Sequence, residues 1–354
     1  MKVAVISMGS VSSQWVVEKL KQYFDVVDEY HIKYFEVQLT GKELIILYKG
    51  EEFKSYDCIY AKGSFRYANI LESITSALEE NTYLPLRANA FTMGHNKILT
   101  HLVLQKNKLP MPKTFIASSV IAAKKVLKDI KYPVIMKLPS GTHGVGVMIS
   151  DSYDSASSMI DTLTALKQSF LIQEYIETGG SDIRALIVGD QVIACMKRQA
   201  VKGEKRANVH AGGSTNKGKL SKSSEKIVIR AAKALGCDIC GVDLLETPSG
   251  PKIVEVNLSP GLQGISKVSD IDLADIIAKF LFEKTKELKK TKTKKEHTSM
   301  MQELLSEEQE LITQVEYRGE RIILPKLVSK LSKFEENDDV VITSKKGNIT
   351  IKKY

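Results

Sequence analysis

The sequence holds only four cysteines among 354 residues, too few for a disulfide framework in a chain of this length. Cys237 and Cys240 form a Cys-x-x-Cys pair, but no matching second pair follows to complete a four-ligand metal site. The pair also leads into an apolar strand, where residues three apart face opposite sides. The spacing therefore favours a structural role over metal or redox chemistry.

Long apolar runs are lacking too, since no segment approaches the roughly 18 apolar residues of a membrane span. The first residues, MKVAVISMGS, form a short apolar run that ends at Gly9 with no cleavage-site pattern after it. They predict a first β-strand rather than a signal peptide. The hydrophobic fraction of 43% and the charged fraction of 26% are typical of a soluble globular protein. We expect a cytoplasmic protein with no membrane partner, long enough for about two or three domains.

The formal net charge of +9 is unevenly spread along the chain. Seven lysines crowd one short stretch: Lys284, Lys286, Lys289, Lys290, Lys292, Lys294 and Lys295. Such a run is typical of a solvated linker or helix end, and weak contact with nucleic acid is the alternative. The remaining excess suits an anionic substrate such as a nucleotide.

The first 110 residues alternate strand-like and helix-like segments, the pattern of a small α/β domain. Strands are predicted at 3–6, 44–48 and 58–61, and helices at 12–20, 70–78 and 91–104. Pro110 and Pro112 then break the pattern, because two prolines cannot continue a helix. We therefore predict a first domain over residues 1–110.

Residues 111–283 are predicted to form a larger core with two antiparallel hairpins. The first hairpin covers 182–199 and turns at Gly189-Asp190, a favoured two-residue pair. The second covers 242–257 and turns between Pro248 and Gly250. A basic linker is predicted over 284–313 and a small β-rich domain over 314–354, with strands at 317–324, 340–344 and 348–352.

The strongest chemical signal is a set of oxygen-bearing side chains on the second hairpin. Glu255 and Asn257 are two apart on one strand, so both point to the same face, and Asp243 on the preceding strand can lie beside them. Carboxylates with a neutral oxygen suit a hard cation, and magnesium takes one or two carboxylates and fills its sphere with water and phosphate oxygens. A solvated strand face with ordinary acidic residues is the alternative.

Three further segments suit a phosphate-bearing ligand. Lys137 ends a strand and is followed by the glycine-rich run GTHGVG, whose backbone N–H groups can approach phosphate oxygens, although no Gly-Lys-Ser/Thr closes it as in a P-loop. The strand end QEYI can offer its backbone to a planar base. Arg198, Arg206 and Asn208 can hold an oxyanion or phosphate, with ordinary solvated loop residues as the alternative.

In order, these segments resemble the ATP-grasp superfamily, and most closely its RimK-type glutamate ligases. The matching runs are IMKLPSGTHGVGV, FLIQEYIETGGSDIRALIVGDQVIACMKRQA, KRANVHAGGS and GVDLLETPSGPKIVEVNLSPGLQGI, within about residues 85–285. The resemblance implies an α/β fold of the mixed α+β ATP-grasp kind. It comprises a small N-terminal α/β domain, a two-subdomain ATP-grasp core and a small C-terminal β-rich domain.

The resemblance also implies a role for each matching residue. Lys97 and Lys137 would contact ATP phosphates, Gly141, Gly144 and Gly146 would close over them, and Glu174 and Tyr175 would line the adenine. Asp182 and Arg198 would help hold the nucleotide, and Arg206, Ala207 and Asn208 would border the reacting phosphoryl group, with Arg206 and Asn208 as the catalytic pair. Asp243, Glu255 and Asn257 would hold one or two Mg²⁺ or Mn²⁺ ions. Asn96, before Lys97, replaces the aspartate that relatives often have.

The reaction implied by the resemblance has two steps, in which ATP activates an acceptor carboxylate as an acyl phosphate and L-glutamate, or a similar amino acid, displaces phosphate. The acceptor would be a small coenzyme or a protein C-terminus. The tail from Tyr317 resembles an AbrB-type swapped-hairpin domain, which implies a homo-oligomer or, through Arg318, Arg321 and Lys326, DNA contact. Two alternatives stand beside this reading: a nucleotide-responsive DNA-binding regulator, and a ligase for a different amino acid.

Overall fold

The computed structural model describes the chain except residues 142–143, 201–212, 306–313, 315, 327 and 329–331, and within 293–305 only the helical backbone. The chain forms two compact units, Met1–Thr291 and Lys292–Tyr354. In the described part, no helix combines the length and the apolar character that crossing a bilayer requires.

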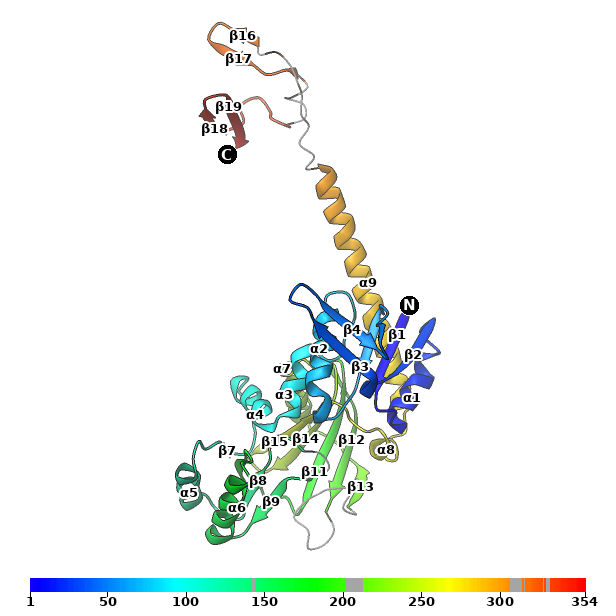
Figure 1. Ribbon diagram of the computed structural model, residues 1–354, viewed down its shortest axis with the longest axis vertical. Helices are drawn as coiled ribbons and strands as arrows, with labels where there is room; N and C mark the ends of the chain where they lie inside the picture. The colour runs from blue at the N-terminus through cyan, green and yellow to red at the C-terminus, as the bar shows by residue number, and fades with distance from the viewer. Residues whose placement is uncertain (142–143, 201–212, 306–313, 315, 327, 329–331) are drawn as a thin grey trace. The chain divides into compact units, whose positions relative to one another are not determined.

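The N-terminal part is built on a parallel three-stranded sheet with the order β2-β1-β6 (Figure 1). The central strand β1 is apolar from Val3 to Ile6 and buried on both faces, as expected of a parallel strand with elements on each side. The sheet and its first crossover helix, which Ser10 caps, consist of β1 (Lys2–Ser7), α1 (Val11–Leu20), β2 (Val26–His31) and β6 (Cys58–Ala61).

An antiparallel meander and three helices complete this part. Its elements are β3 (Phe35–Leu39), β4 (Leu44–Tyr48), β5 (Glu51–Glu52), α2 (Ala68–Leu78), α3 (Ala88–His95) and α4 (Lys97–Lys106). The single helix predicted over 91–104 was wrong, because two helices meet at Asn96. The Oδ1 atom of Asn96 accepts hydrogen bonds from the backbone of Ile98 and Leu99, so the side chain caps a new helix where the pattern predicted continuation.

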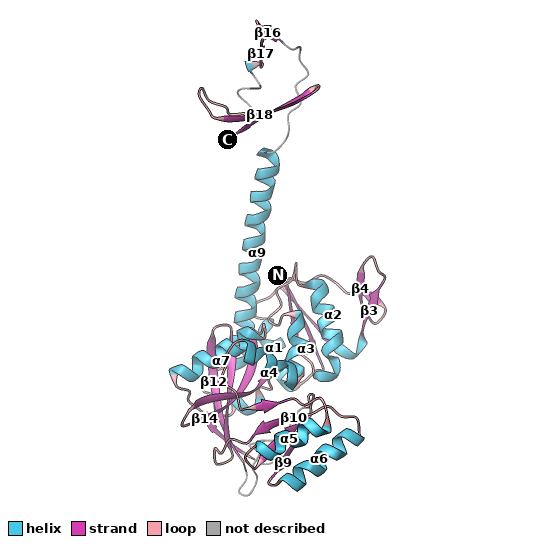
Figure 2. Cartoon of the chain, turned by 90° about the vertical axis from the view of Figure 1, so that its left-hand side faces the viewer, coloured by secondary structure: helices cyan, strands magenta, loops and turns pink. Residues whose placement is uncertain are grey.

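A four-stranded antiparallel sheet with the order β7-β10-β8-β9 follows. Helices α5 and α6 lie side by side on one face of it (Figure 2), and Ala123, Leu127 and Ile160 pack there against Met136 and Ile172. The elements are β7 (Thr114–Phe115), α5 (Val120–Asp129), β8 (Val134–Lys137), β9 (Val147–Ser150), α6 (Tyr153–Ala165) and β10 (Leu171–Glu174).

The second antiparallel sheet has five strands in the order β13-β12-β11-β14-β15. Both predicted hairpins are confirmed, with turns at Gly189-Asp190 and Pro248-Ser249 between paired strands. The elements are β11 (Ser181–Val188), β12 (Gln191–Gln199), β13 (Ser214–Lys217), α7 (Lys222–Ala234), β14 (Ile239–Thr247) and β15 (Gly250–Asn257).

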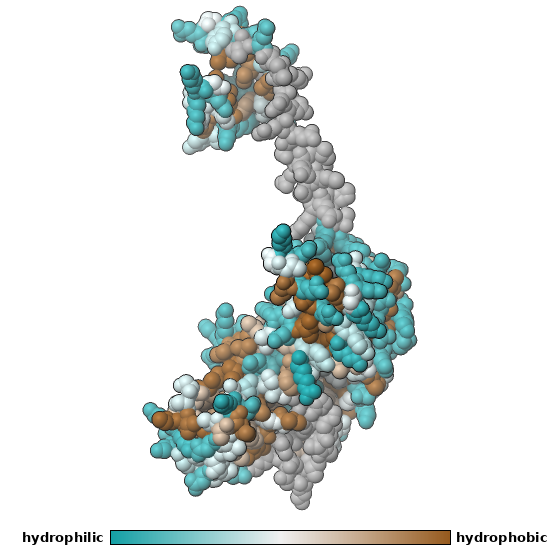
Figure 3. Space-filling model, viewed as in Figure 1, coloured by the Kyte–Doolittle hydropathy of each residue, from teal (hydrophilic) through white to brown (hydrophobic). Residues whose placement is uncertain are grey.

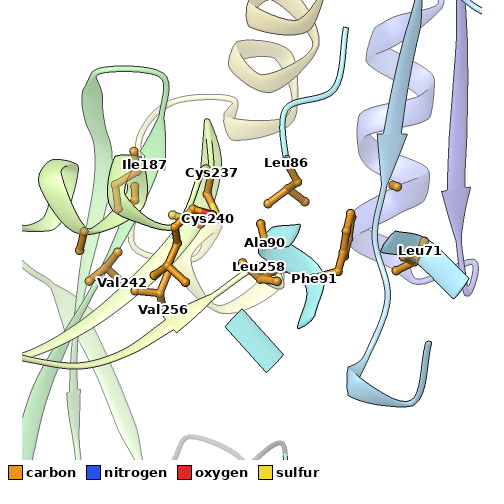
Figure 4. Close-up of a cluster of buried hydrophobic side chains, with 14 of the residues drawn as sticks. Leu71, Leu86, Ala90, Phe91, Ile187, Cys237, Cys240, Val242, Val256 and Leu258 are labelled. Atoms are coloured by element: carbon orange, nitrogen blue, oxygen red, sulfur yellow. The ribbon is translucent and has the colours of Figure 1, made fainter. Parts of the chain in front are cut away.

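One apolar core joins the N-terminal helices to the five-stranded sheet. Figure 4 shows Leu258 between Phe91 of α3, on the right, and Val242 and Val256 of the sheet, on the left, with Ala90 of α3 directly above it. Cys237 and Cys240 are buried in this core as free thiols, and the described residues contain no group of three or more His, Cys, Asp or Glu placed to hold a metal ion. The predicted boundary near residue 110 therefore does not separate two independent cores.

The lysine-rich stretch predicted as a linker is helical through Leu305. After the short α8 (Gln263–Ser266), helix α9 runs over Leu273–Leu305. Its first part packs in the N-terminal unit, because Thr285 is fully buried and Lys289 forms an ion pair with Asp57. A truncation intended to keep this unit whole must therefore lie beyond Lys289.

The C-terminal unit contains two β-hairpins. The single strand predicted over 317–324 was wrong, because the chain turns back at Gly319, whose φ of 68° suits glycine, to form β16 (Glu316–Arg318) and β17 (Arg321–Ile323). The second hairpin is confirmed as β18 (Val340–Lys345) and β19 (Asn348–Lys353), turning at Lys346-Gly347. Apolar side chains, among them Tyr317, Ile342 and Ile349, are exposed on both hairpins, and Figure 3 shows apolar atoms on this unit's surface.

The close approach of α3 to Leu258 makes Gly94 a test of the shared core. A Cβ atom at Gly94 would lie 2.7 Å from two side-chain atoms of Leu258. We expect Gly94→Ala to lower the free energy of unfolding by about 1–3 kcal/mol through overpacking. The matched control is Gly261→Ala, where a Cβ would meet nothing within 4 Å. Chemical denaturation measures both, and equal stabilities would contradict the tight contact.

Candidate functional site

Four charged side chains interlock on three neighbouring strands of the five-stranded sheet. Arg198 of β12 lies opposite Asp182 of β11, and its Nε and Nη2 atoms donate to the two carboxylate oxygens at 2.6 and 2.5 Å. Arg184, two residues along β11, lies opposite Asp243 of β14 and donates to both its oxygens at 2.6 and 2.7 Å. Arg198 also donates to Asp243 at 2.8 Å, which joins the two pairs into one cluster.

Burial and the two guanidinium groups act on the two carboxylates differently. Burial alone would raise the pKa of Asp243, but the charges and hydrogen bonds of Arg184 and Arg198 outweigh it and hold that pKa well below the ordinary range. Asp182 has one guanidinium partner, so burial, which Arg198 opposes and the charge of Asp243 reinforces, raises its pKa to about 6. Asp243 therefore stays ionised at neutral pH in a site where it is only 5% exposed.

Arg184 is the member of this cluster that the sequence analysis missed. The signal was present, because Arg184 follows Asp182 by two residues on one strand and must share its face. It was overlooked because a charged residue in a hairpin strand reads as an ordinary solvated position. Only the pairing of β11 with β14 places it opposite a buried carboxylate.

The three predicted metal ligands lie where the hairpin pairing brings them together. Asp243 is opposite Glu255, and Asn257 is opposite Gly241, two residues before Asp243. The Oδ1 atom of Asn257 accepts a hydrogen bond from the backbone of Ser259, which leaves it a second lone pair. Two carboxylates and one amide oxygen form a donor set suited to a hard cation such as Mg²⁺, and the chemistry of these residues therefore fits one.

Lys137, at the end of β8, is held by a buried hydrogen-bond network. Its ammonium donates to Gln173 Oε1 at 2.7 Å, and Gln173 Nε2 donates to Thr114 Oγ1 at 2.8 Å and lies 2.9 Å from His101 Nε2. Burial lowers the pKa of Lys137 to about 8, while Glu255 and Asp243 oppose that shift. These opposing charges belong to the five-stranded sheet, to which the four-stranded sheet is joined by the ion pair of Glu174 with Lys252.

Lys97 and the glycine-rich segment lie next to each other. Lys97, the first residue of α4, donates from Nζ to the carbonyl oxygen of Gly141 at 3.1 Å. A Cβ at Gly141 would lie 2.6 Å from the carbonyl oxygen of Val145, and Gly144 and Gly146 have φ values of 78° and 81°. These contacts explain the glycines, because larger residues would strain or block the turn. His143 lies outside the described residues.

The strand end Glu174-Tyr175 connects the two antiparallel sheets. Glu174 Oε1 accepts from the backbone N–H of Lys113 and from Nζ of Lys252, both at 2.8 Å. Lys252 belongs to β15, so this carboxylate bridges the four-stranded sheet to the five-stranded one. The backbone of the segment, rather than the Glu174 side chain, is therefore the part suited to a planar base. Arg206, Ala207 and Asn208 lie outside the described residues.

Taken together, two antiparallel sheets present basic groups from one and carboxylates from the other to a shared site, which suits a triphosphate with a cation. This is the fold of the ATP-grasp ligases. The chain superposes on the ATP-grasp ligase PsnB in complex with a precursor variant, Mg and ADP, with a TM-score of 0.63 and 17% identity over 80% of this chain and 98% of that one. A D-alanine–D-alanine ligase from Bacillus anthracis gives a TM-score of 0.58 and 16% identity over 82% of this chain and 99% of that one.

Sequence comparison narrows the class to a family. A model of the RimK-like ATP-grasp domain matches residues 94–281. A probable alpha-L-glutamate ligase of Marinomonas sp. (strain MWYL1) is 35% identical over 83% of this chain and 99% of that protein, and one of Psychromonas ingrahamii is 33% identical over the same shares. The chain belongs to the RimK-like ATP-grasp family, and it is a ligase that forms carbon–nitrogen bonds.

The buried charge cluster predicts a large effect of removing its overlooked member. In Arg184→Met, Asp243 keeps only Arg198 as a partner, and we expect a loss of about 2–4 kcal/mol in the free energy of unfolding. Arg230→Met is the control, because this exposed arginine donates a single hydrogen bond to the backbone of Asn107. Similar losses for the two variants in urea denaturation would contradict the role given to Arg184.

Proposed function

We propose that this ligase adds L-glutamate to an acceptor carboxylate, using ATP with Mg²⁺ or Mn²⁺. The names of its relatives support glutamate as the amine substrate. The observation that carries the proposal is the pairing of Asp243 with Glu255 on neighbouring strands, with both carboxylates acting on the buried ammonium of Lys137. A carboxylate pair beside a buried lysine suits a cation and the phosphates it neutralises. Free cysteines and the use of ATP favour the cytoplasm as its location.

Each site residue has a role in this proposal. Lys97 and Lys137 would contact ATP phosphates, and the turn with Gly141, Gly144 and Gly146 would close over them. The backbone of Glu174 and Tyr175 would line the adenine. Asp182 and Arg198 would hold the nucleotide, and Arg206, Ala207 and Asn208 would border the reacting phosphoryl group.

Asp243, Glu255 and Asn257 would hold one or two divalent cations. A bound cation would neutralise charge on the phosphate oxygens. Arg184 and Arg198 hold the Asp243 carboxylate in one orientation, so it is preorganised. The buried network of Gln173 and His101 fixes Lys137 in the same way.

The reaction proceeds in two displacements at this site. An oxygen of the acceptor carboxylate attacks the γ-phosphorus of ATP, ADP leaves, and an acyl phosphate forms. The amine nitrogen of glutamate then attacks the acyl carbon, the carbon–oxygen bond to phosphate breaks, and the nitrogen loses a proton as the amide forms. Catalysis of the first step rests on positioning and charge neutralisation, so the chain needs no serine or cysteine nucleophile.

Phosphate release tests this function. The full chain is incubated with ATP, Mg²⁺, L-glutamate and candidate acceptors, which include small coenzymes and peptides with free C-termini. We expect release only when acceptor and glutamate are both present, and almost none with Glu255→Gln, which keeps the side-chain shape but removes the charge. Circular dichroism checks that this variant is folded. If Glu255→Gln turned over at the wild-type rate, Glu255 would have no role in metal binding. If phosphate release did not depend on glutamate, a ligase for another amino acid would be favoured.

The C-terminal unit is proposed to join two copies of the chain. Isolated two-stranded hairpins are marginally stable in water, and those described here expose Val341, Ile342 and Ile349. A second copy of the unit would cover these side chains. Arg318 and Arg321 could instead face DNA phosphates, which is the alternative role.

Truncation after Thr291 separates these roles. This end point keeps Thr285 and Lys289, which pack in the N-terminal unit. We expect the truncated chain to keep its ligase turnover and, by light scattering, to contain one copy per particle where the full chain contains two. An unchanged number of copies per particle would exclude the tail as the interface. A salt-sensitive DNA shift that needs the tail would instead support DNA binding.

A further inference from the structure

The strand order of the parallel N-terminal sheet creates a topological switch point, a place where open α/β sheets commonly bind ligands. Its order β2-β1-β6 means that the chain leaves the central strand β1 for one side and later returns to its other side. In open α/β sheets, ligands bind outside the carboxyl ends of the strands at such a switch point. Here those ends are Ser7 of β1 and Ala61 of β6, and no residue assigned above belongs to this sheet.

The segment that follows β15 of the five-stranded sheet is hydrogen-bonded to residues at this switch point. Ser259 Oγ accepts from the backbone N–H of Gly63 at 3.1 Å and donates to its carbonyl oxygen at 3.0 Å. The backbone N–H of Leu262 donates to Ser12 Oγ of α1 at 2.9 Å. The same segment begins at Asn257, a proposed cation ligand, so it connects the switch point to the proposed cation site.

Lys62, the residue after β6, places a buried cation at the switch point. The residue is 5% exposed, and its Nζ atom lies 3.5 Å from the carbonyl oxygen of Pro260 and 5.6 Å from the centre of the Tyr60 ring. Within the described residues, no carboxylate lies at ion-pair distance from it. Burial lowers the pKa of Lys62 to about 8. An ammonium buried with one long hydrogen bond and no counter-charge is costly, so the fold keeps it at the expense of stability.

His95, at the end of α3 and hydrogen-bonded to Gly63, carries a second polar atom whose hydrogen-bonding capacity is not filled. One ring nitrogen is hydrogen-bonded to the backbone of Gly63. The other, Nε2, is buried and has no hydrogen-bond partner among the described residues. Burial, with the charge of Lys97, lowers the pKa of His95 to about 4, so the ring is neutral and Nε2 is an acceptor. A donor with one long hydrogen bond and an acceptor without a partner therefore belong to residues that adjoin Gly63 in the chain or bond to it.

We infer that Lys62 anchors a carboxylate of one of the two substrates at this switch point, next to the segment that leads from the proposed cation site. The inference rests on the proposed function, since that reaction joins two carboxylate-bearing molecules. The carboxylate is either that of the incoming amino acid or a non-reacting one of the acceptor. Its arrival gives the Lys62 ammonium the counter-charge it lacks, and the flexible lysine stem lets the ammonium follow it. His95 Nε2 offers an acceptor for an N–H or O–H of the same substrate.

Binding measurements on the full chain with Mg²⁺ and a non-hydrolysable ATP analogue test the inference without turnover. Calorimetric titration uses two probes. L-glutamate represents the incoming amino acid. N-acetyl-L-glutamate has a blocked amine, so it can represent only the acceptor. We expect Lys62→Met to weaken one probe at least about tenfold, as for a lost charged hydrogen bond, with nucleotide affinity unchanged. Lys62→Arg should retain part of the probe affinity that Lys62→Met loses. The probe that is weakened identifies the source of the carboxylate.

Thermal unfolding separates ligand binding from a structural role. Lys62→Met removes a buried charge without a partner, so its melting temperature should equal or exceed that of the wild type, as should that of Lys62→Gln. Lys106→Met, at an exposed lysine, is the control for both measurements.

Three results would overturn the inference: both probes bind Lys62→Met within about twofold of the wild type, neither probe binds the wild type, or melting temperature and nucleotide affinity fall together. The phosphate-release screen tests the proposed reaction independently of the binding measurements. Product formation with unchanged probe binding in Lys62→Met would sink only the inference. A wild type that binds a probe through Lys62 but yields no product would sink only the proposed reaction.

Discussion

The charge cluster of Arg184, Arg198, Asp182 and Asp243 is the constraint on which the described site depends. Two guanidinium groups hold the carboxylate of Asp243 ionised in a place where burial would otherwise favour its protonation. Because each arginine makes a bidentate contact, the planes of the four side chains are set as well as their charges. The cluster therefore delivers an oriented carboxylate beside Glu255, which a cation site needs before any ligand arrives.

The connection between the sheets matters as much as either sheet. Glu174 is tied to Lys252 of the five-stranded sheet, and Lys97 to the carbonyl group of Gly141. The shared core of Phe91 and Leu258 fixes the N-terminal helices against the same sheet. The segment after β15 then carries a proposed cation ligand at its start and is hydrogen-bonded to Gly63 through Ser259. The proposed sites for substrate and for phosphate thereby lie on elements that pack against one another.

A buried polar group that lacks a partner lowers the stability of the fold. Lys137 is buried, but Gln173 and nearby carboxylates compensate its charge. Lys62 is equally buried and lacks such a counter-charge among the described residues. The contrast separates a lysine whose site is complete within the protein from one whose site a ligand would complete. Local strain or unpaired charge of this kind concentrates at functional places because elsewhere selection has no reason to keep it.

The amino-acid sequence by itself determined the fold class, both hairpins of the five-stranded sheet and the shared face of Asp243, Glu255 and Asn257. The hairpins and the shared face follow from the period of two along a strand and from turn residues, which act locally. The ATP-grasp class was implied by the resemblance of the ordered motifs. It did not determine the helix break at Asn96, the hairpin at Gly319, the partner of Arg184 or the isolation of Lys62. The helix break depends on whether the Asn96 side chain caps a new helix. The other features depend on contacts between segments far apart in the chain. Only tertiary structure decides them, because whether a charge is paired, solvated or stranded depends on which distant residues pack around it.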